Sequence, residues 1–308
     1  MNPVEQRATR LGALPWRDAK PPTTLGRGTL VNLRDLWSRR HLLNLLVRRE
    51  IRAKYKNSAL GMVWSLIKPL VQLLVYYFVV GKFLGAARSI PDFAIYVYTG
   101  LALWTLFNEI VNGGTASVVN NAAIVKKVRL PGAIFPLSAA GNALFNFAVQ
   151  LVVLFAMILI VGRVTPVGRW GYLPLAIAVM VVWGTALGVF LAAANVYLRD
   201  TQYLVEVALM IGFWGSPIVY SWAMVQSVLS GTIQAIYLMN PMTLGILGIQ
   251  KALWAGKGIQ KAIHGAGVIY FPPSLLPRMW IALGIGLVGL FFAQWYLSRL
   301  QGNFAQEI

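Results

Sequence analysis

Two charged residues interrupt stretches of sequence that are otherwise apolar enough to lie in a membrane. Lys68 falls in the first such stretch and Glu109 in the next. Ionisable groups are costly inside a bilayer, so both are candidates for a functional role. At a rise of 1.5 Å per helical residue, each lies roughly 10 Å inside, counted from the same side. They could pair or both face a watery passage, and Lys68 could instead extend back to the interface.

Polar and aromatic side chains recur at helical spacing within the apolar stretches. Gln72 and Tyr76 follow Lys68 at intervals of four residues, and Phe213 and Tyr220 flank Pro217. Aromatic faces can carry sugar rings along without fixing one register, by analogy with single-stranded nucleic acids on aromatic platforms. Aromatic residues at the outer end of a span are more often interface anchors. The candidate substrate path therefore comprises Lys68, Gln72, Tyr76, Glu109, Phe213 and Tyr220.

A short basic island, Asn120–Pro136, separates two long apolar stretches. Positive charge in a short loop between spans is typical of the cytoplasmic side. The island is too short to form a domain, so we interpret it as the place where another protein contacts the membrane bundle. The candidate contact residues are Ile124, Val125, Lys126, Lys127, Val128 and Arg129.

Several other kinds of chemistry find little support in the sequence. The chain has no cysteine, and its nine acidic residues form no D-x-D or D-x-x-D pair of the kind that holds a metal against a diphosphate. It also lacks the G-x-x-x-x-G-K-[ST] loop that cradles nucleotide phosphates. A membrane enzyme acting on a lipid-linked sugar is therefore a poor match. A proton-coupled carrier would need a relay of buried acids, for which Glu109 is the one candidate.

Composition places the chain among integral membrane proteins. Of its 308 residues 58% are hydrophobic and 12% charged, with a mean hydropathy of +0.65, whereas soluble domains carry roughly 25% charged residues. A helix needs about 20 apolar residues to cross a bilayer. We expect an all-α membrane domain of six spans within residues 61–299, and the predicted spans are 61–82, 93–118, 134–161, 173–197, 203–224 and 276–298.

A segment rich in glycine and proline separates the fifth and sixth spans. Its apolar pieces, 233–238 and 242–253, are too short to cross the membrane. We therefore predict short re-entrant or outer helices there.

The sequence before the first span is strongly basic. Residues 1–29 are rich in proline and glycine and are predicted to form a disordered cytoplasmic tail. In residues 30–56, apolar residues recur at helical spacing and the opposite face is rich in arginine. This pattern predicts an amphipathic helix in the headgroup plane, although such a helix could also pack on a soluble partner. Its basic face favours anionic lipid over nucleic acid as a partner. The residues expected at the interface are Trp37, Arg48, Arg49 and Arg52.

The distribution of positive charge predicts the orientation of the chain. With the N-terminus in the cytoplasm, 18 of the 27 Lys and Arg residues fall in cytoplasmic segments and 8 in outer segments, with Lys68 inside the first span. Cytoplasmic loops carry the excess of positive charge in membrane proteins. Both termini are therefore predicted to lie in the cytoplasm.

Five short motifs resemble those of ABC-2 type permeases that export polysaccharides such as O-antigen, teichoic acid and galactan. They are residues 48–69, Ile124–Leu137, Tyr197–Asp200, Ser216–Tyr220 and Asn240–Met242. Each motif alone is weak, but they occur in the family's order, and the resemblance extends from Arg34 to Arg299. One departure is that Gly132 and Ala133 stand where the family often has a charged pair after the proline of the island.

The resemblance implies a homodimer in the bacterial cytoplasmic membrane, whose two six-span bundles enclose a channel for a lipid-linked polysaccharide. It implies that the amphipathic helix lies at the cytoplasmic interface and that the island supplies a coupling helix seated on a separate ATPase subunit, present in two copies. ATP and Mg²⁺ would bind to that subunit, and this chain would hold no cofactor or metal. An ABC-2 exporter of a drug or lipid shares this topology and stays open as an alternative.

Overall fold

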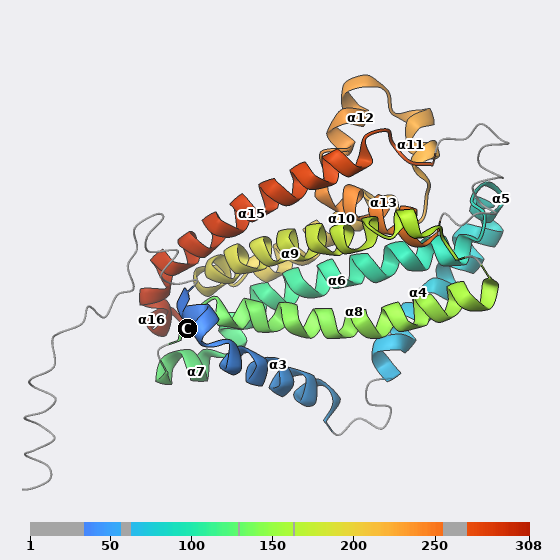
Figure 1. The fold of residues 1–308 in the computed structure, drawn as a ribbon. Helices are drawn as coiled ribbons and strands as arrows, with labels where there is room; N and C mark the ends of the chain where they lie inside the picture. Colours follow the sequence, from blue (N-terminus) through green and yellow to red (C-terminus); the bar gives the residue numbers. More distant parts are fainter. Residues whose placement is uncertain (1–33, 57–62, 129, 163, 255–269) are drawn as a thin grey trace, which may run out of the picture.

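The computed structural model describes residues 34–56, 63–128, 130–162, 164–254 and 270–308, except the side chains of Tyr55, Ser65 and Lys68. Over these residues the chain is helical and contains no strand, which confirms the predicted all-α class (Figure 1). The predicted disordered tail, residues 1–29, lies outside the described residues.

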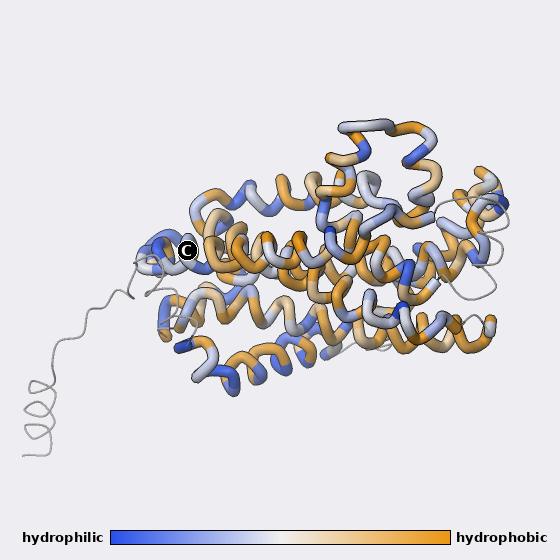
Figure 2. The backbone as a smooth tube through the Cα atoms, turned by 45° about the horizontal axis from the view of Figure 1, so that its top comes forward, coloured by the Kyte–Doolittle hydropathy of each residue, from blue (hydrophilic) through white to orange (hydrophobic). Residues whose placement is uncertain are grey.

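Four helices of the described chain are long and apolar enough to cross a membrane. They are α6 (Phe93–Asn120), α8 (Ile134–Val161), α9 (Tyr172–Tyr197) and α15 (Leu275–Leu300). Figure 2 shows hydrophobic residues along these helices and hydrophilic ones gathered on α3 (Arg40–Tyr55) and near the C-terminus. The predicted second, third, fourth and sixth spans coincide with these four helices within about two residues, within the usual uncertainty of helix ends.

The region predicted as the first span is also helical, but its apolar part is shorter. Helix α4 (Trp64–Tyr76) continues into a π-helical turn, η2 (Tyr77–Phe83), and then into the short α5 (Ala86–Ser89). Its apolar portion, Pro69–Phe83, is shorter than the other four. The count of six spans therefore stays a prediction.

The fifth predicted span, 203–224, is wrong as a single helix. Helix α10 (Thr201–Trp214) ends at Trp214, and α11 (Trp222–Val228) begins after a non-helical segment. Ser216 precedes Pro217, and the residue before a proline is sterically disfavoured in helical geometry. The freed carbonyls are bonded by distant side chains: the Tyr96 hydroxyl donates to Tyr220 O at 2.8 Å, and Gln250 Nε2 donates to Pro217 O at 2.9 Å. Protein donors of this kind allow a break at membrane depth.

The predicted short helices after this break are present. Helices α12 (Gly231–Tyr237) and α13 (Pro241–Leu253) meet at a bend of 78° and together could make one broken span or a re-entrant loop. The Asn240 side chain caps α13 by accepting a hydrogen bond from Met242 N at 3.0 Å. Helix α12 is largely exposed, whereas α13 is buried along nearly its whole length.

Helices α6 and α9 approach each other at two glycines. A Cβ atom built on Gly114 of α6 would lie 2.8 Å from Gly188 Cα of α9. Gly188 belongs to the G-x-x-x-G pair with Gly184, which faces Ile110 of α6. Small residues at these positions let the two helix backbones approach closely.

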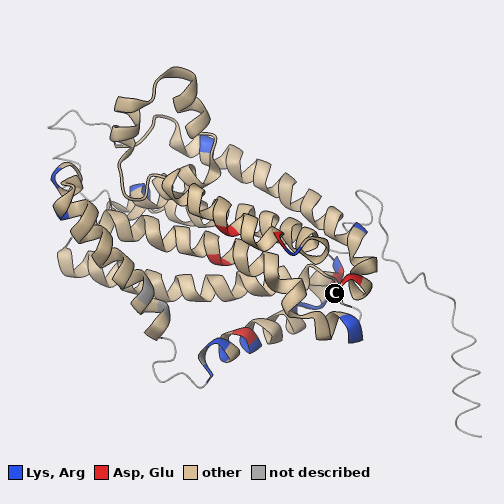
Figure 3. Cartoon of the chain, turned by 180° about the vertical axis from the view of Figure 1, so that it is seen from behind, with Lys and Arg blue, Asp and Glu red and all other residues tan. Residues whose placement is uncertain are grey.

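Both described ends of the chain lie at one end of the bundle. Helix α3, helix α7 (Ala122–Lys127) and the terminal α16 (Phe304–Glu307) gather there, while α5, α11 and α12 lie toward the other end (Figure 1). Lys and Arg residues gather at the ends of the bundle and on α3 (Figure 3). This arrangement agrees with two termini on one side of a membrane, and which side they face stays a prediction.

Candidate functional site

The basic island forms a short separate helix, α7, between α6 and α8. Ile124 and Val125 are half-buried and pack against an apolar cluster that contains Leu46 of α3 and Phe304 of α16. Lys126, Lys127 and Val128 are exposed, whereas Arg129 lies outside the described residues. The predicted contact residues thus divide into two that hold the island on the bundle and three that are available to a partner.

The apolar face of α3 packs on the bundle itself. Leu46 is buried, and Val47 lies so close to Gly141 of α8 that a Cβ there would be 2.7 Å from Val47 Cγ2. Ser138 of α8 donates a hydrogen bond to Glu50 Oε1 at 2.7 Å, and burial raises the pKa of the Glu50 carboxyl. The predicted position of this helix in the headgroup plane, and the alternative of a soluble partner, stay predictions for the faces of α3 that remain exposed.

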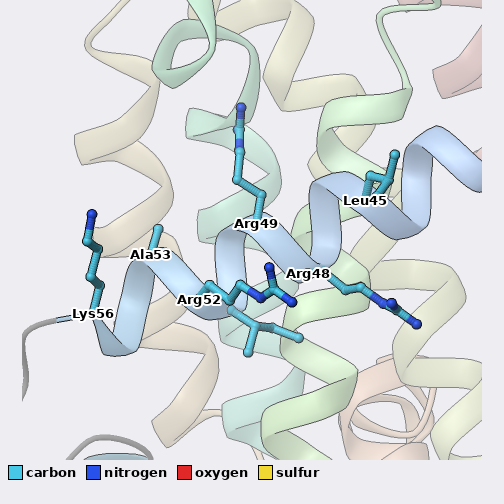
Figure 4. Close-up of a pocket in the computed structure, with 7 residues that line it drawn as sticks. Leu45, Arg48, Arg49, Arg52, Ala53 and Lys56 are labelled. Atoms are coloured by element: carbon cyan, nitrogen blue, oxygen red, sulfur yellow. The ribbon is translucent and has the colours of Figure 1, made fainter.

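The exposed side of α3 is basic. An open cavity of about 790 Å³ is lined by side chains of this one helix, Leu45, Arg48, Arg49, Ile51, Arg52, Ala53 and Lys56. Arg48 and Arg49 leave the helix in different directions (Figure 4), and Arg49 Nη2 donates to Asn121 Oδ1 at the junction of α6 and α7. Arg48, Arg52 and the more N-terminal Trp37 are exposed. Arg49 therefore links α3 to the island, while Arg48 and Arg52 are free to meet a negatively charged surface.

Glu109 is bound by two neighbouring elements. Its Oε1 lies 3.6 Å from Lys54 Nζ of α3, and Asn146 Nδ2 of α8 donates to its Oε2 at 2.6 Å. Because the side chain of Lys68 lies outside the described residues, the proposed Lys68–Glu109 pair stays a prediction. Sequence reasoning missed Lys54, although the spacing of Val47, Glu50 and Lys54 puts all three on the face of α3 that packs on the bundle.

Replacing Lys54 with methionine is expected to lower the thermal unfolding midpoint in detergent by a few degrees at most. The two side chains are 41% and 31% exposed, so solvent screens much of their attraction. Adding Glu109→Gln should recover part of the loss, because the carboxylate left without Lys54 is then removed. A double variant no more stable than Lys54→Met would show that the pair does not contribute. Lys56→Met, at the exposed residue that directly follows the same helix, is the control.

Two predicted path residues from different spans meet in the structure. The Tyr76 ring of α4 stacks on Phe213 of α10 at a centroid distance of 5.8 Å. Trp214 packs edge-on against Tyr76 at 6.5 Å, and Trp104 of α6 packs edge-on against Phe213 at 5.7 Å. The four rings form one aromatic cluster joining α4, α6 and α10. Trp104 was missed, because nothing in its local sequence indicates which span it faces.

Tyr220 takes a different role. Its hydroxyl donates to Trp214 O at 2.9 Å and lies 3.2 Å from the Tyr237 hydroxyl of α12. Tyr220 therefore bridges the two sides of the break after α10, and it is half-buried.

Polar groups also occur on α4, α6 and α10, the three helices that carry the aromatic cluster. Gln72 of α4 and Glu206 of α10 are exposed among exposed apolar residues of the same helices. Gln202 Nε2 of α10 lies 3.5 Å from Asn112 Oδ1 of α6, and Asn112 in turn donates to Asn108 at 2.9 Å. A carboxylate facing lipid costs a few kcal/mol. Gln72 and Glu206 thus interrupt the exposed, largely apolar faces of α4 and α10.

Comparison with known proteins identifies the family. Residues 41–254 match the family described as ABC-2 type transporter, which is more than half of the chain. The chain is 29% identical over 210 residues to the O-antigen export system permease protein RfbA of Myxococcus xanthus, covering 68% of this chain and 79% of that one. It is 27% identical over 243 residues to the RfbA permease of Klebsiella pneumoniae, covering 79% and 90%.

These matches agree with the motifs that carried the resemblance and with the helical membrane fold. The relatives are named permeases, which are transport proteins and not enzymes. The chain belongs to the ABC-2 type transporter family.

Proposed function

We propose that this chain is the membrane subunit of an ATP-driven exporter that moves a lipid-linked polysaccharide of the O-antigen class across the bacterial cytoplasmic membrane. The names of the relatives support the substrate class. The observation that carries the proposal is the stacking of Tyr76 on Phe213 between α4 and α10, two helices whose exposed faces also carry Gln72 and Glu206. Aromatic faces bind flat apolar surfaces without demanding one register, and the polar groups suit the hydroxyls of a sliding sugar chain.

A second copy of the chain completes the path. One bundle leaves the polar and aromatic side of α4 and α10 exposed, whereas two copies meeting across these helices would enclose it. Homodimers with closed twofold symmetry are the commonest assembly of this kind. Each copy would then contribute Tyr76 to one shared channel, with Phe213, which is buried at 8% exposure, packed against the Tyr76 ring.

The energy comes from a separate subunit. The sequence holds no phosphate-cradling G-x-x-x-x-G-K-[ST] loop, so ATP and Mg²⁺ bind to an ATPase, in two copies for two permease chains. The exposed part of α7, Lys126, Lys127 and Val128, is the surface that it contacts. The exposed arginines of α3 lie against anionic lipid headgroups of the same membrane face, and both termini lie in the cytoplasm.

Cysteine labelling tests the path, because the chain has no natural cysteine to interfere. We expect Gln72→Cys and Tyr76→Cys to react with a membrane-impermeant thiol reagent in the assembled exporter, and a glycan stalled in transit to slow the reaction. The control is Val152→Cys on α8, an apolar position that is 69% exposed and should react only with a lipid-soluble reagent. If the two path positions behave like Val152→Cys, they face lipid and the proposed path is wrong.

A further inference from the structure

The end of the island carries a feature that contact with an ATPase does not explain. Gly132 and Ala133 replace the charged pair that similar permeases often have there, and both are buried. A Cβ atom built on Gly132 would lie 2.9 Å from Leu297 Cδ2 and 3.2 Å from Gln301 Oε1. Contacts below 3.0 Å require something to move, so a longer side chain at position 132 would force the Leu297 and Gln301 side chains to shift. At this position, where the charged pair is absent, a segment from the C-terminal end of the chain packs against Gly132.

That segment is Gln301–Ile308, which we call the clamp segment. It consists of a 3₁₀ turn, η4 (Gln301–Asn303), and α16. Gln301 Oε1 accepts a hydrogen bond from the backbone N–H of Gly132 at 2.9 Å, although the two residues are 169 positions apart in sequence. The bond binds the connection between α7 and α8 directly to the end of α15.

A buried aromatic residue holds the clamp segment in place. Phe304 is 1% exposed and belongs to the apolar cluster against which Ile124 and Val125 of α7 pack. Its ring packs edge-on against Tyr197 of α9 at 6.3 Å, and the Tyr197 hydroxyl donates to Leu300 O at 3.3 Å. The island and the clamp segment therefore share one small core.

Helix α7 depends on such contacts for its shape. It has only six residues, and isolated helices shorter than about 12 residues are marginal in water. If α7 transmits a conformational change from a partner to the membrane helices, it must be rigidly attached to them, because a flexible attachment would not transmit the movement. The contacts at Gly132 and Phe304 supply attachment on the side of α7 away from its exposed lysines.

We propose that the clamp segment positions α7 for its partner and that Gln301 is the positioning residue. This inference rests on the proposed coupling function of α7. The contacts that carry this role are the hydrogen bond from the Gly132 N–H to the Gln301 amide oxygen and the buried Phe304 ring. Loss of the Gln301 acceptor should loosen the island locally without unfolding the spans.

Three variants separate the role of the hydrogen bond from other effects. Gln301→Leu keeps the approximate volume and removes the acceptor, whereas Gln301→Glu keeps an acceptor for the Gly132 amide. Gln306→Leu makes the same chemical change at an exposed position of the same segment and serves as the matched control. The first measurement is hydrogen–deuterium exchange in the purified permease without ATPase.

We expect Gln301→Leu to raise exchange in peptides covering 121–135 by roughly fivefold, as loss of one hydrogen bond implies, and to leave α6 and α9 unchanged. Gln301→Glu and Gln306→Leu should resemble the parent protein. In the exporter assembled with its ATPase, Gln301→Leu should lower the amount of glycan exported per ATP hydrolysed. Unchanged exchange in the island would overturn the proposal. A rise that extends through α6 and α9, or a local rise with unchanged export per ATP, would do the same.

The exchange result is independent of whether α7 couples to an ATPase. If Val128→Asp uncouples export while Gln301→Leu changes neither exchange nor export, the clamp is wrong and the coupling function stands. If neither variant affects export, the proposed coupling function of α7 is wrong, whatever the exchange experiment shows for the clamp segment.

Discussion

Replacing Val128 with aspartate is expected to abolish export while the permease still inserts into the membrane. Val128 is 51% exposed at the end of α7, so in the free chain its replacement is solvated and costs little stability. Within a contact with an ATPase, the same carboxylate would be buried without a dedicated partner. Such a burial costs about 3 kcal/mol, which corresponds to about 100-fold weaker association.

The measurement is co-purification of the ATPase with the permease, together with glycan export in cells. Val128→Thr, which is nearly the same size and uncharged, is the control and should retain both. Ile124→Asp is a poorer test than Val128→Asp. Ile124 is half-buried against the apolar cluster, so its replacement would also disturb the packing of the bundle. Normal co-purification and export by Val128→Asp would show that α7 is not the contact surface.

Adding one methyl group at Gly114 is expected to destabilise the bundle more than a methyl group elsewhere in the spans. The new Cβ would meet the backbone of Gly188 at 2.8 Å, and backbone atoms yield only if α6 and α9 move apart. Overpacking of this kind costs about 1–3 kcal/mol or more. We expect Gly114→Ala to lower the thermal unfolding midpoint in detergent by several degrees and to reduce the yield of monodisperse protein.

Gly289→Ala makes the same change on α15 at a position where the new Cβ meets nothing within 4 Å. It should leave the midpoint unchanged or raise it slightly, because alanine is the better helix former. Equal midpoints for the two variants would contradict the close approach of α6 and α9.

Long apolar runs were enough to predict four of the spans. Helix α8 begins and ends at the predicted residues, 134 and 161, and α6, α9 and α15 differ by about two residues. The fifth span was predicted too long, because an apolar run does not reveal whether its backbone carbonyls find other donors. A proline such as Pro217 can only suggest a kink. The carbonyls of the break are bonded by Tyr96 and Gln250, which lie more than thirty positions away in sequence.

The candidate site could be predicted from the sequence only where its residues lie on one face of a single helix. The stripe on α4 and the stripe on α10 were visible separately, yet their contact through Tyr76 and Phe213 depends on how two spans pack. The same limit applies to Lys54 of α3, whose partner Glu109 lies on α6, with α4, η2 and α5 between them in sequence. Gln301 was not predicted, because a glutamine at this position has no local sequence pattern that indicates a hydrogen bond to Gly132.

Reconstitution into proteoliposomes tests the central claim most directly. The permease and its ATPase are incorporated together, a labelled lipid-linked O-antigen glycan is supplied on the side that carries the ATPase, and its appearance on the other side is measured with and without ATP. We predict translocation that requires ATP and both subunits and that is lost with Val128→Asp. Translocation of the glycan without the ATPase, or ATP-driven movement of a small drug or phospholipid but not of the glycan, would contradict the account.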